Sequence, residues 1–379
     1  MKITVSVHGR FHAFELARGL SQFGYLDQLL TTYPSFMVQK FVGSDVVLKT
    51  APFLELRRRL HSKFNITGNP GLSIARRFGA FSKRHIRKDT DIFVGWSSAS
   101  LEAIRPMQEL GAKVIIERGS THIANQTDVL CAAYKEFGLC FNQTDSEIIE
   151  REEQEYMLAD KISVPSNYAA QTFVDRGISK NKIFINGYGV DLEQFKPPTS
   201  RESDRKPRII FVGSVGIRKG VPWLLDAFKY LSSKAELHLI GPISPDYEPM
   251  LRHGVGKNIH VRGALAGGQL AAEYGRGDIF CLPSLEEGYG MVVPQAMACG
   301  LPIVTTHVVG AVDLIKHGHN GLIVDSGDRT ALAEALGCLV DDAPLRQLMG
   351  ANALATIQSG HSWVDYVDRS ITFYEGILG

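Results

Sequence analysis

Residues 278–306 read DIFCLPSLEEGYGMVVPQAMACGLPIVTT, and this stretch is the clearest indicator of the fold. An apolar run at residues 278–284 leads into a loop with two glycines, and a helical pattern follows at residues 293–299. A second apolar run occupies residues 302–306. Strand, helix and strand in this order predict a βαβ unit, in which both strands lie parallel in one sheet.

The same alternation continues on both sides of this stretch. Short apolar runs with strand character recur between helical patterns: ITVSVH (residues 3–8), DIFVGW (91–96), KVIIE (113–117), RIIFVG (208–213), ELHLIG (236–241) and NIHVRG (258–263). The alternation covers the runs up to residue 117 as one group and begins again after residue 207. We therefore predict two doubly wound α/β domains, each built on a parallel sheet.

A segment rich in Pro and charge separates the two groups of strands. Residues 192–208, LEQFKPPTSRESDRKPR, have the composition of a linker, so we place the first domain at residues 1–199 and the second at 200–361. The tail at residues 362–379 spaces its apolar side chains at helical intervals. It is predicted to form a helix that packs back on the first domain.

Composition restricts the class of protein. The chain has 379 residues, of which 44% are hydrophobic and 21% charged, as in soluble globular proteins. Lys and Arg number 41 against 40 Asp and Glu, which argues against a nucleic-acid-binding protein. Five cysteines without a CxxC pair, no signal-peptide pattern and no apolar run of spanning length favour a cytoplasmic location.

Two loops could hold an anionic ligand. Gly288 and Gly290 lie between a predicted strand and a helix start, where backbone N–H groups and the helix dipole favour a phosphate. Arg218 and Lys219 follow Gly213, which ends another strand of the same domain. Both loops are expected at the carboxyl edge of the sheet, where they could grip a pyrophosphate. Taken singly, either cation would be interpreted as a surface charge.

At this point the sequence resembles a known family. GSVGIRKGVPWLLDAF (213–228), PSLEEGYGMVVPQAMACGLPIVTT (283–306) and GLIV (321–324) resemble the nucleotide-sugar half of the family 4 retaining glycosyltransferases of the GT-B fold. EEQEYMLADKISVPSNYAAQTF (152–173) and NGYGVDLEQFKP (186–197) are similar to the end of that family's acceptor half. The resemblance implies two Rossmann-like domains facing an interdomain cleft.

The resemblance also implies roles for particular residues. Arg218 and Lys219 would stabilise the leaving diphosphate, and Glu287 would contact the donor sugar. Gln295 stands where the family has a second Glu that takes the ribose hydroxyls, so a neutral amide would replace a charge there. The other expected donor contacts are Gly9, Arg10, Gly213, Arg262, Gly288, Tyr289, Gly290 and Met291.

Two histidines are candidates at the edge of the first sheet. His122 follows the strand at residues 113–117 and matches the family's histidine that reaches the donor sugar, so we expect a catalytic contact there. His12 follows the first strand, and either it or Arg10 could contact phosphate or acceptor. For both histidines, a packed structural role is the alternative.

No metal and no cofactor besides the nucleotide-sugar donor are expected. The His and Cys residues show no HExxH or other clustered spacing. Six acids between Asp145 and Glu155 are interpreted as one solvated helix face.

A basic segment interrupts the near-neutral charge of the chain. Residues 51–90 contain ten Lys or Arg and two acids, a local net charge of +8. Ile74, Phe78 and Phe81 recur at helical spacing among these cations. Residues 57–88 could therefore lie on an anionic membrane, pack against the core with a basic exterior, or form a pocket for an anionic acceptor.

The sequence thus favours a retaining, metal-independent glycosyltransferase. It would move a hexose from a UDP- or GDP-sugar to a hydroxyl acceptor, which we expect to be a glycolipid or surface polysaccharide, in the cytoplasm or at the inner face of the membrane. Two alternatives stay open. One is a sugar-nucleotide 2-epimerase of the same architecture, and the other is a protein that binds nucleotide sugars without turnover.

Overall fold

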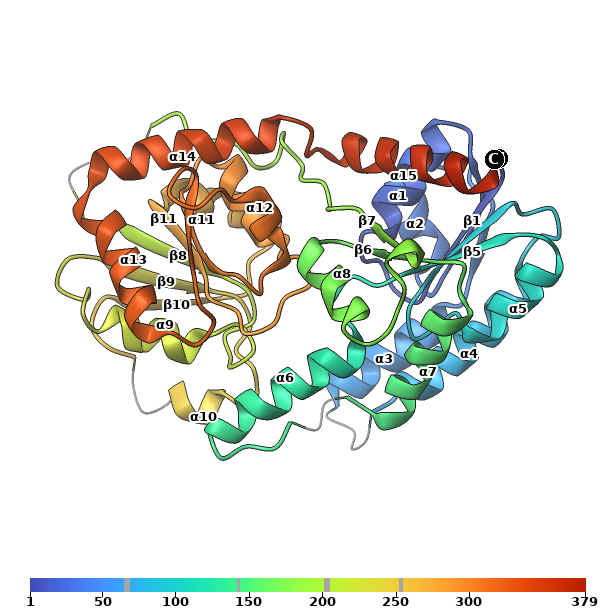
Figure 1. Ribbon diagram of the computed structural model, residues 1–379, viewed down its shortest axis with the longest axis horizontal. Coiled ribbons are helices and arrows are strands. Elements are labelled where there is room, and N and C mark those ends of the chain that lie inside the picture. Colours follow the sequence, from blue (N-terminus) through green and yellow to red (C-terminus); the bar gives the residue numbers. More distant parts are fainter. Residues whose placement is uncertain (65–68, 142–143, 201–204, 252–254) are drawn as a thin grey trace.

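The computed structural model describes residues 1–379 except 65–68, 142–143, 201–204 and 252–254. Two parallel sheets form its centre, and they lie side by side along the long axis (Figure 1). Each sheet is covered by helices on both faces, which explains why its central strands, such as β1, β4 and β11, are buried along their whole length. The sequence prediction of two doubly wound sheets is confirmed.

The first α/β unit contains the sheet β3-β2-β1-β4-β5-β6-β7. Its strands are β1 (Ile3–Val7), β2 (Leu26–Thr31), β3 (Leu48–Thr50), β4 (Ile92–Trp96), β5 (Lys113–Glu117), β6 (Lys161–Val164) and β7 (Ile183–Ile185). Its helices are α1 (Ala13–Gln22), α2 (Ser35–Val42), α3 (Pro52–Lys63), α4 (Gly71–His85), α5 (Leu101–Glu109), α6 (Ile123–Glu136), α7 (Ser146–Leu158) and α8 (Asn167–Val174), with a short 3-10 turn at Lys180–Lys182.

The second α/β unit contains the sheet β10-β9-β8-β11-β12-β13. Its strands are β8 (Arg208–Val212), β9 (Glu236–Ile240), β10 (Ile259–Gly263), β11 (Ile279–Leu282), β12 (Ile303–Thr306) and β13 (Gly321–Val324). Its helices are α9 (Val221–Phe228), α10 (Glu248–Leu251), α11 (Gly268–Arg276), α12 (Val292–Ala298), α13 (Arg329–Asp341) and α14 (Ala343–Gln358), with a 3-10 turn at Gly310–Leu314.

Strand order positions the functional loops. In the first sheet the order reverses between β1 and β4, and in the second between β8 and β11. A crevice opens at the carboxyl ends of the strands at such a reversal. The loops that leave β1, β4, β8 and β11 are therefore the ones that the topology favours for ligand binding.

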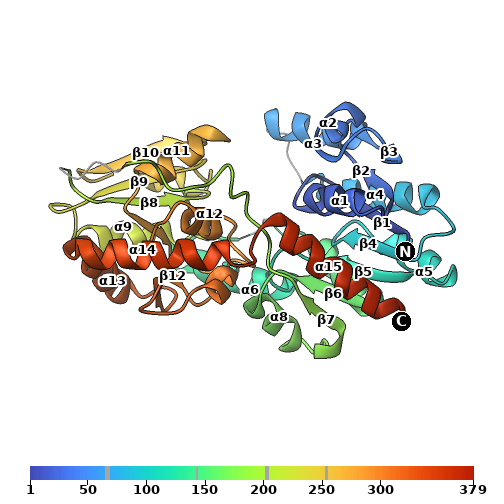
Figure 2. The ribbon, with the colours of Figure 1, turned by 90° about the horizontal axis from the view of Figure 1, so that it is seen from above.

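The last helix, α15 (Trp363–Leu378), returns to the first unit and packs against α1 (Figure 2). Buried Asn186 donates from Nδ2 to Ser370 Oγ (2.9 Å), and the rings of Phe184 and Phe373 stack with centroids 3.8 Å apart. The boundary that we placed at residues 199 and 200 borders residues 201–204, outside the described part of the chain, and stays a prediction.

The acids of α7 differ from the prediction of a solvated face. Glu152 and Glu155 are buried, and the Glu155 carboxylate accepts hydrogen bonds from the backbone N–H groups of Ser98 (2.7 Å), Ser100 (2.7 Å) and Leu101 (2.9 Å). Ser98 lies in the turn before α5, Ser100 is the N-cap and Leu101 is the first residue of the helix, where N–H groups have no partner within the helix. Burial and the neighbouring Glu152 raise the pKa of Glu155 to about 8, although the N–H groups of Ser100 and Ser98 and the charge of Arg151 act in the opposite direction. The prediction was wrong for these two acids, which have hydrogen-bond donors inside the protein, whereas Glu147, Glu150 and Glu153 are exposed as predicted.

Replacing Glu155 by Ala should destabilise the protein by roughly 3 kcal/mol, because three buried N–H groups lose their acceptor. The loss of stability is measured as a shift in the midpoint of urea unfolding. The matched control is Glu153→Ala on the same helix, where the side chain is exposed and an effect within about 0.5 kcal/mol is expected. Equal midpoints for the two variants would contradict the capping role.

Candidate functional site

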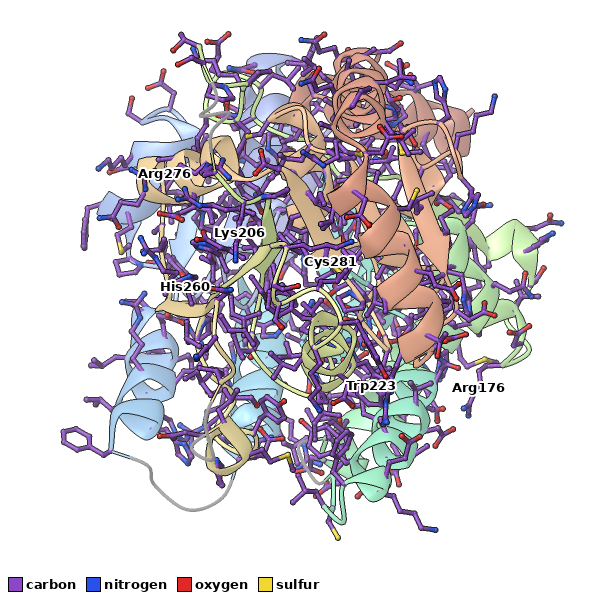
Figure 3. The ribbon with its side chains drawn as sticks, turned by 90° about the vertical axis from the view of Figure 1, so that its left-hand side faces the viewer. Arg176, Lys206, Trp223, His260, Arg276 and Cys281 are labelled. Atoms are coloured by element: carbon purple, nitrogen blue, oxygen red, sulfur yellow. The ribbon has the colours of Figure 1, made fainter. Side chains whose placement is uncertain are left out.

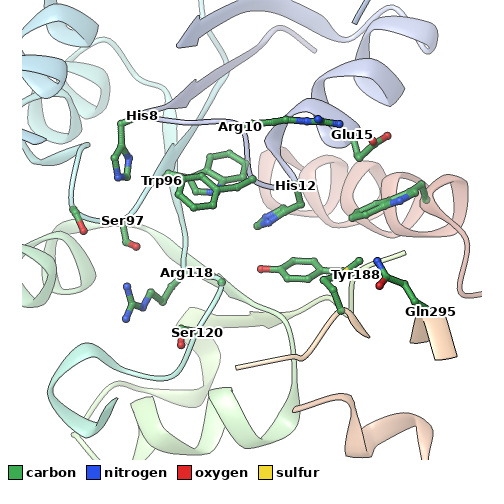
Figure 4. A pocket seen from close by; sticks show the side chains of 15 residues that line it. His8, Arg10, His12, Glu15, Trp96, Ser97, Arg118, Ser120, Tyr188 and Gln295 are labelled. Carbon is green, nitrogen blue, oxygen red and sulfur yellow. The ribbon is translucent and has the colours of Figure 1, made fainter. Parts of the chain in front are cut away.

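A cavity of about 680 Å³ lies between the two units, at the carboxyl edges of both sheets. Most of its wall comes from the loops that follow β1, β4 and β5, and α12 closes it from the second unit. Its lining residues are His8, Arg10, Phe11, His12, Glu15, Trp96, Ser97, Ser98, Arg118, Gly119, Ser120, Tyr188, Met291, Gln295 and Trp363 (Figure 4). The cavity thus occupies the place that the strand order favours.

Aromatic rings and His12 form much of the wall from the first unit. The His12 ring lies 4.1 Å from the ring of Tyr188 and 4.9 Å from that of Trp96, measured between centroids (Figure 4). His12 Nε2 is 3.3 Å from the Glu117 carboxylate at the end of β5. Apolar ring faces beside fixed polar groups are the usual composition of a site for a small organic ligand.

The remaining predicted residues of the first loop have different positions. Arg10 lines the cavity, and its guanidinium lies 3.9 Å from the centroid of the Phe41 ring. Gly9 is buried, and a Cβ atom there would approach the Phe11 ring to 2.7 Å, so a larger residue would displace the exposed Phe11 side chain.

His122 lies elsewhere. It is buried as the N-cap of α6, where its Nδ1 accepts from the Ala124 N–H, and its ring contacts Tyr156 and Phe173. Burial, together with the charges of Arg176 and Arg118, lowers the pKa of His122 to about 4. Among the two candidate histidines, His12 is therefore the one that the fold brings to the cavity.

The loop after β8 brings the predicted cations to the second unit's edge. Arg218 and Lys219 line a smaller cavity of about 290 Å³ against α6, together with Ser214. Lys219 forms an ion pair with Glu287, so the fold joins two residues that were predicted to act together. Burial and the charge of Arg218 lower the pKa of Lys219 to about 7, with Glu286 acting in the opposite direction.

Glycine is required where these two loops touch. Gly220 has φ +71°, and a Cβ atom there would lie 1.8 Å from the carbonyl oxygen of Pro283. Gly213, with φ +149°, also has a backbone that side chains rarely adopt. The loops after β8 and β11 therefore pack backbone to backbone beside the ion pair.

Glu286 is a residue that sequence reasoning missed. Its fully buried carboxylate accepts from the Arg218 Nε (2.9 Å), from Thr121 Oγ1 (2.6 Å) and from Ser120 Oγ (3.0 Å). Gln126 Nε2 donates to the same carboxylate at 2.9 Å. Burial alone would raise the pKa of Glu286, but Arg218 and these donors hold it below its usual range. Little in the sequence indicates this role for Glu286, because the acid that matches the family signature is the next residue, Glu287.

The glycine loop itself contacts the first unit. A Cβ atom on Gly288 would lie 2.3 Å from the Ser120 Cα, and the Gly288 carbonyl accepts from Ser166 Oγ at 2.7 Å. Tyr289 is buried, and its hydroxyl donates to the Tyr188 carbonyl at 3.0 Å. Gly290 follows with φ +85°. Residues 288–290, predicted as donor contacts, thus also form the interface between the two units.

Three other predicted donor contacts come from the second unit. Met291 and Gln295 line the larger cavity, and Gln295 Oε1 accepts from the Tyr274 hydroxyl at 3.1 Å. Arg262 instead lies on β10 and pairs with Glu273 at 3.2 Å, and it lines neither of the two cavities.

One group of potential metal ligands occurs among the described residues. Glu236, His238 and His260 place their ligand atoms within 4.8 Å of one another on β9 and β10, and His260 is labelled in Figure 3. The Glu236 carboxylate already accepts from Arg208 Nε at 3.1 Å, and the group belongs to neither cavity. We assign no metal to it. Separately, none of the described helices is both long and apolar enough to span a bilayer.

Comparison with known proteins identifies the second unit. Residues 206–342 match the family "Glycosyl transferases group 1". D-inositol 3-phosphate glycosyltransferase of Xylanimonas cellulosilytica is 30% identical over 225 residues, which are 54% of each chain. A capsular polysaccharide biosynthesis glycosyltransferase of Staphylococcus aureus is 26% identical over 229 residues, covering 55% of this chain and 59% of that protein. The chain thus matches little more than half the length of these curated relatives.

Solved structures extend the likeness to the whole chain. Sucrose-phosphate synthase of Thermosynechococcus elongatus superposes with a TM-score of 0.76 and 18% identity, covering 99% of this chain and 98% of that one. HepE of Anabaena, solved in complex with UDP, superposes with a TM-score of 0.71 and 14% identity over 99% and 100% of the two chains. Residues 206–342 thus resemble a group 1 glycosyltransferase domain, and the chain as a whole has the GT-B fold.

Proposed function

We propose that this protein transfers a hexose from a UDP- or GDP-sugar to a hydroxyl acceptor, with retention of anomeric configuration. The observation that carries the proposal is the placement of Arg218 and Lys219 beside Glu287, next to a cavity that both units line. The UDP bound to the HepE neighbour and the sugar-transferring relatives support the same class of donor. No cofactor or metal is part of the proposal.

The cations supply the chemistry that the donor needs. Breaking the bond between sugar and diphosphate leaves negative charge on the departing phosphate, and preorganised positive groups stabilise it. Arg218 and Lys219 are held in place by Glu286 and Glu287 before any ligand arrives. By the family resemblance, the leaving phosphate accepts the proton of the acceptor hydroxyl.

The aromatic side of the cavity supports a sugar-like acceptor. Trp96, Tyr188 and Trp363 offer ring faces, and Arg10 and Arg118 offer hydrogen-bond donors beside them. Such surfaces suit the apolar faces and hydroxyl groups of a sugar ring. A glycolipid or surface polysaccharide as acceptor also agrees with the capsular polysaccharide relative.

A donor panel tests the reaction class. The protein is incubated with UDP-, GDP- and ADP-sugars, with and without sugar acceptors, and free nucleotide and the recovered sugar are measured. Nucleotide release that depends on acceptor is the expected result. Conversion of the donor sugar to its 2-epimer without acceptor would replace the proposal by the epimerase alternative. Binding without any turnover would leave a nucleotide-sugar-binding protein.

Lys219→Ala should weaken binding of UDP-glucose by roughly ten- to a hundredfold, because a charge-assisted contact to the diphosphate is lost. Isothermal titration calorimetry measures the dissociation constant. Lys229→Ala is the matched control, since Lys229 is on the surface with 74% of its side chain exposed. Unchanged affinity in Lys219→Ala, together with no release from any donor, would contradict the proposed function.

The pKa of Lys219 near 7 adds a pH dependence. The ammonium is charged below its pKa and loses its proton above it, so affinity for UDP-glucose should fall about tenfold between about pH 6 and pH 8. UDP-glucose suits this experiment because its diphosphate has no proton that dissociates in that range. Lys219→Arg should bind with a flat profile, and an equally steep profile in that variant would exclude Lys219 as the origin.

A further inference from the structure

Helix α3 presents a stripe of large apolar side chains to solvent. Phe53, Leu56, Leu60 and Phe64 are 58%, 57%, 41% and 65% exposed. They are three or four residues apart and so lie on one side of the helix. The side that packs on the core holds Leu54, which is fully buried. Single exposed apolar residues are ordinary, but a contiguous stripe indicates a contact surface.

Helix α2 extends this stripe. Phe36, in its first turn, is 73% exposed. The starts of the two helices are close, because Ser35 Oγ lies 3.4 Å from Thr50 Oγ1, just before α3. Figure 2 shows α2 and α3 together at the β3 edge of the first sheet. We call Phe36, Phe53, Leu56, Leu60 and Phe64 the α2–α3 patch.

Cations flank the α2–α3 patch. Arg57, Arg58 and Arg59 are all exposed on α3, and the last two are held by the nearly buried carboxylate of Glu55. They belong to the segment 51–90, whose net charge is +8. Apolar side chains on a convex helix, bordered by fixed positive charge, complement a surface that is both apolar and anionic.

The structure changes which helix carries this surface. Ile74 and Phe78 of α4 are buried at 5% and 0% exposure, so of the three alternatives that the sequence left open for these side chains, packing against the core is the one observed. That face of α4 belongs to the core, and its cations Arg76, Arg77, Lys83 and Arg84 are on the outside. The exposed apolar groups lie on the preceding helices instead.

We infer that the α2–α3 patch docks this protein on an anionic lipid bilayer. A lipid surface complements both the apolar side chains and the positive charge of the patch. Acyl chains accept the Phe and Leu side chains, and anionic headgroups neutralise the arginines. A second copy of the chain fits less well, because the same basic segments would face each other across a two-fold interface.

Docking in this way would bring helix α2, which contacts a residue of the larger cavity, to the bilayer. Arg10 lines that cavity and stacks on Phe41 of α2, the same helix that carries Phe36. An acceptor hydroxyl carried by a lipid would then reach the cavity from the membrane surface. This last step rests on the proposed function, whereas membrane docking itself does not.

Vesicle co-sedimentation tests the docking. The full-length chain is mixed with phosphatidylcholine vesicles containing about one third phosphatidylglycerol, and with pure phosphatidylcholine vesicles. The wild type should bind the anionic vesicles at least roughly tenfold more tightly than the neutral ones. The variant Phe53→Ser/Leu56→Ser/Leu60→Ser/Phe64→Ser should lose at least roughly tenfold in binding to the anionic vesicles. These side chains are exposed, so the fold should be kept, and circular dichroism verifies it.

Matched controls separate the α2–α3 patch from general stickiness. Tyr230→Ser/Leu348→Ser removes apolar groups that are 79% and 60% exposed on the second unit, and vesicle binding should not change. Arg57→Gln/Arg77→Gln should weaken binding to anionic vesicles and reduce its dependence on salt. UDP-glucose affinity of the patch variant, measured by calorimetry, should equal that of the wild type.

Three results would overturn the inference. The first is a wild type that binds neither kind of vesicle, and the second is a patch variant that binds anionic vesicles as well as the wild type does. The third is a dimer in sedimentation velocity that dissociates in the patch variant, without vesicle binding, which would make a second copy the occupant. Failure of donor binding with intact vesicle binding would instead contradict only the proposed function.

Discussion

The buried carboxylate of Glu286 joins the two α/β units, and the rest of the site depends on it. A buried charge is tolerated only when donors surround it, and here they come from both sides of the interface. Ser120, Thr121 and Gln126 belong to the first unit, while Arg218 belongs to the second. Because the donors belong to separate units, the hydrogen bonds of one carboxylate hold the loop after β5, helix α6 and the loop after β8 together.

Several features of the candidate site follow from that contact. The loop carrying Glu286 is pressed so close to the first unit that residue 288 has no room for a side chain. The next carboxylate along the chain, Glu287, is left to pair with Lys219. Arg218 is therefore oriented by one acid and Lys219 by the next, so that two cations stand side by side in spite of their repulsion. An anionic donor would therefore bind to two cations whose mutual repulsion the carboxylates already offset.

The fold separates two groups of cations in space. A net charge of +1 conceals a segment of +8, residues 51–90, which contains α3 and α4. Those cations lie on the first unit, whereas the cations expected to hold the donor lie on the second. The protein thus separates an exposed basic surface, bordered by apolar side chains, from a half-buried pair of cations that has its own carboxylates. Exposed charges act over a broad surface and are screened by salt, while the half-buried pair acts at contact distance.

The sequence by itself determined the two parallel sheets, because strands covered on both faces must be apolar along their length, and this leaves a local pattern. It also placed the loops at residues 213–220 and 283–291 at the ends of strands, because each follows an apolar run and contains glycine. Only the tertiary structure decided that Glu155 caps α5, that Glu286 bridges the units, and that His12 rather than His122 faces the cavity. It also decided that α3, and not α4, exposes its apolar side. Each of these depends on which distant segment packs against a residue, and helical or strand spacing carries no information about that partner.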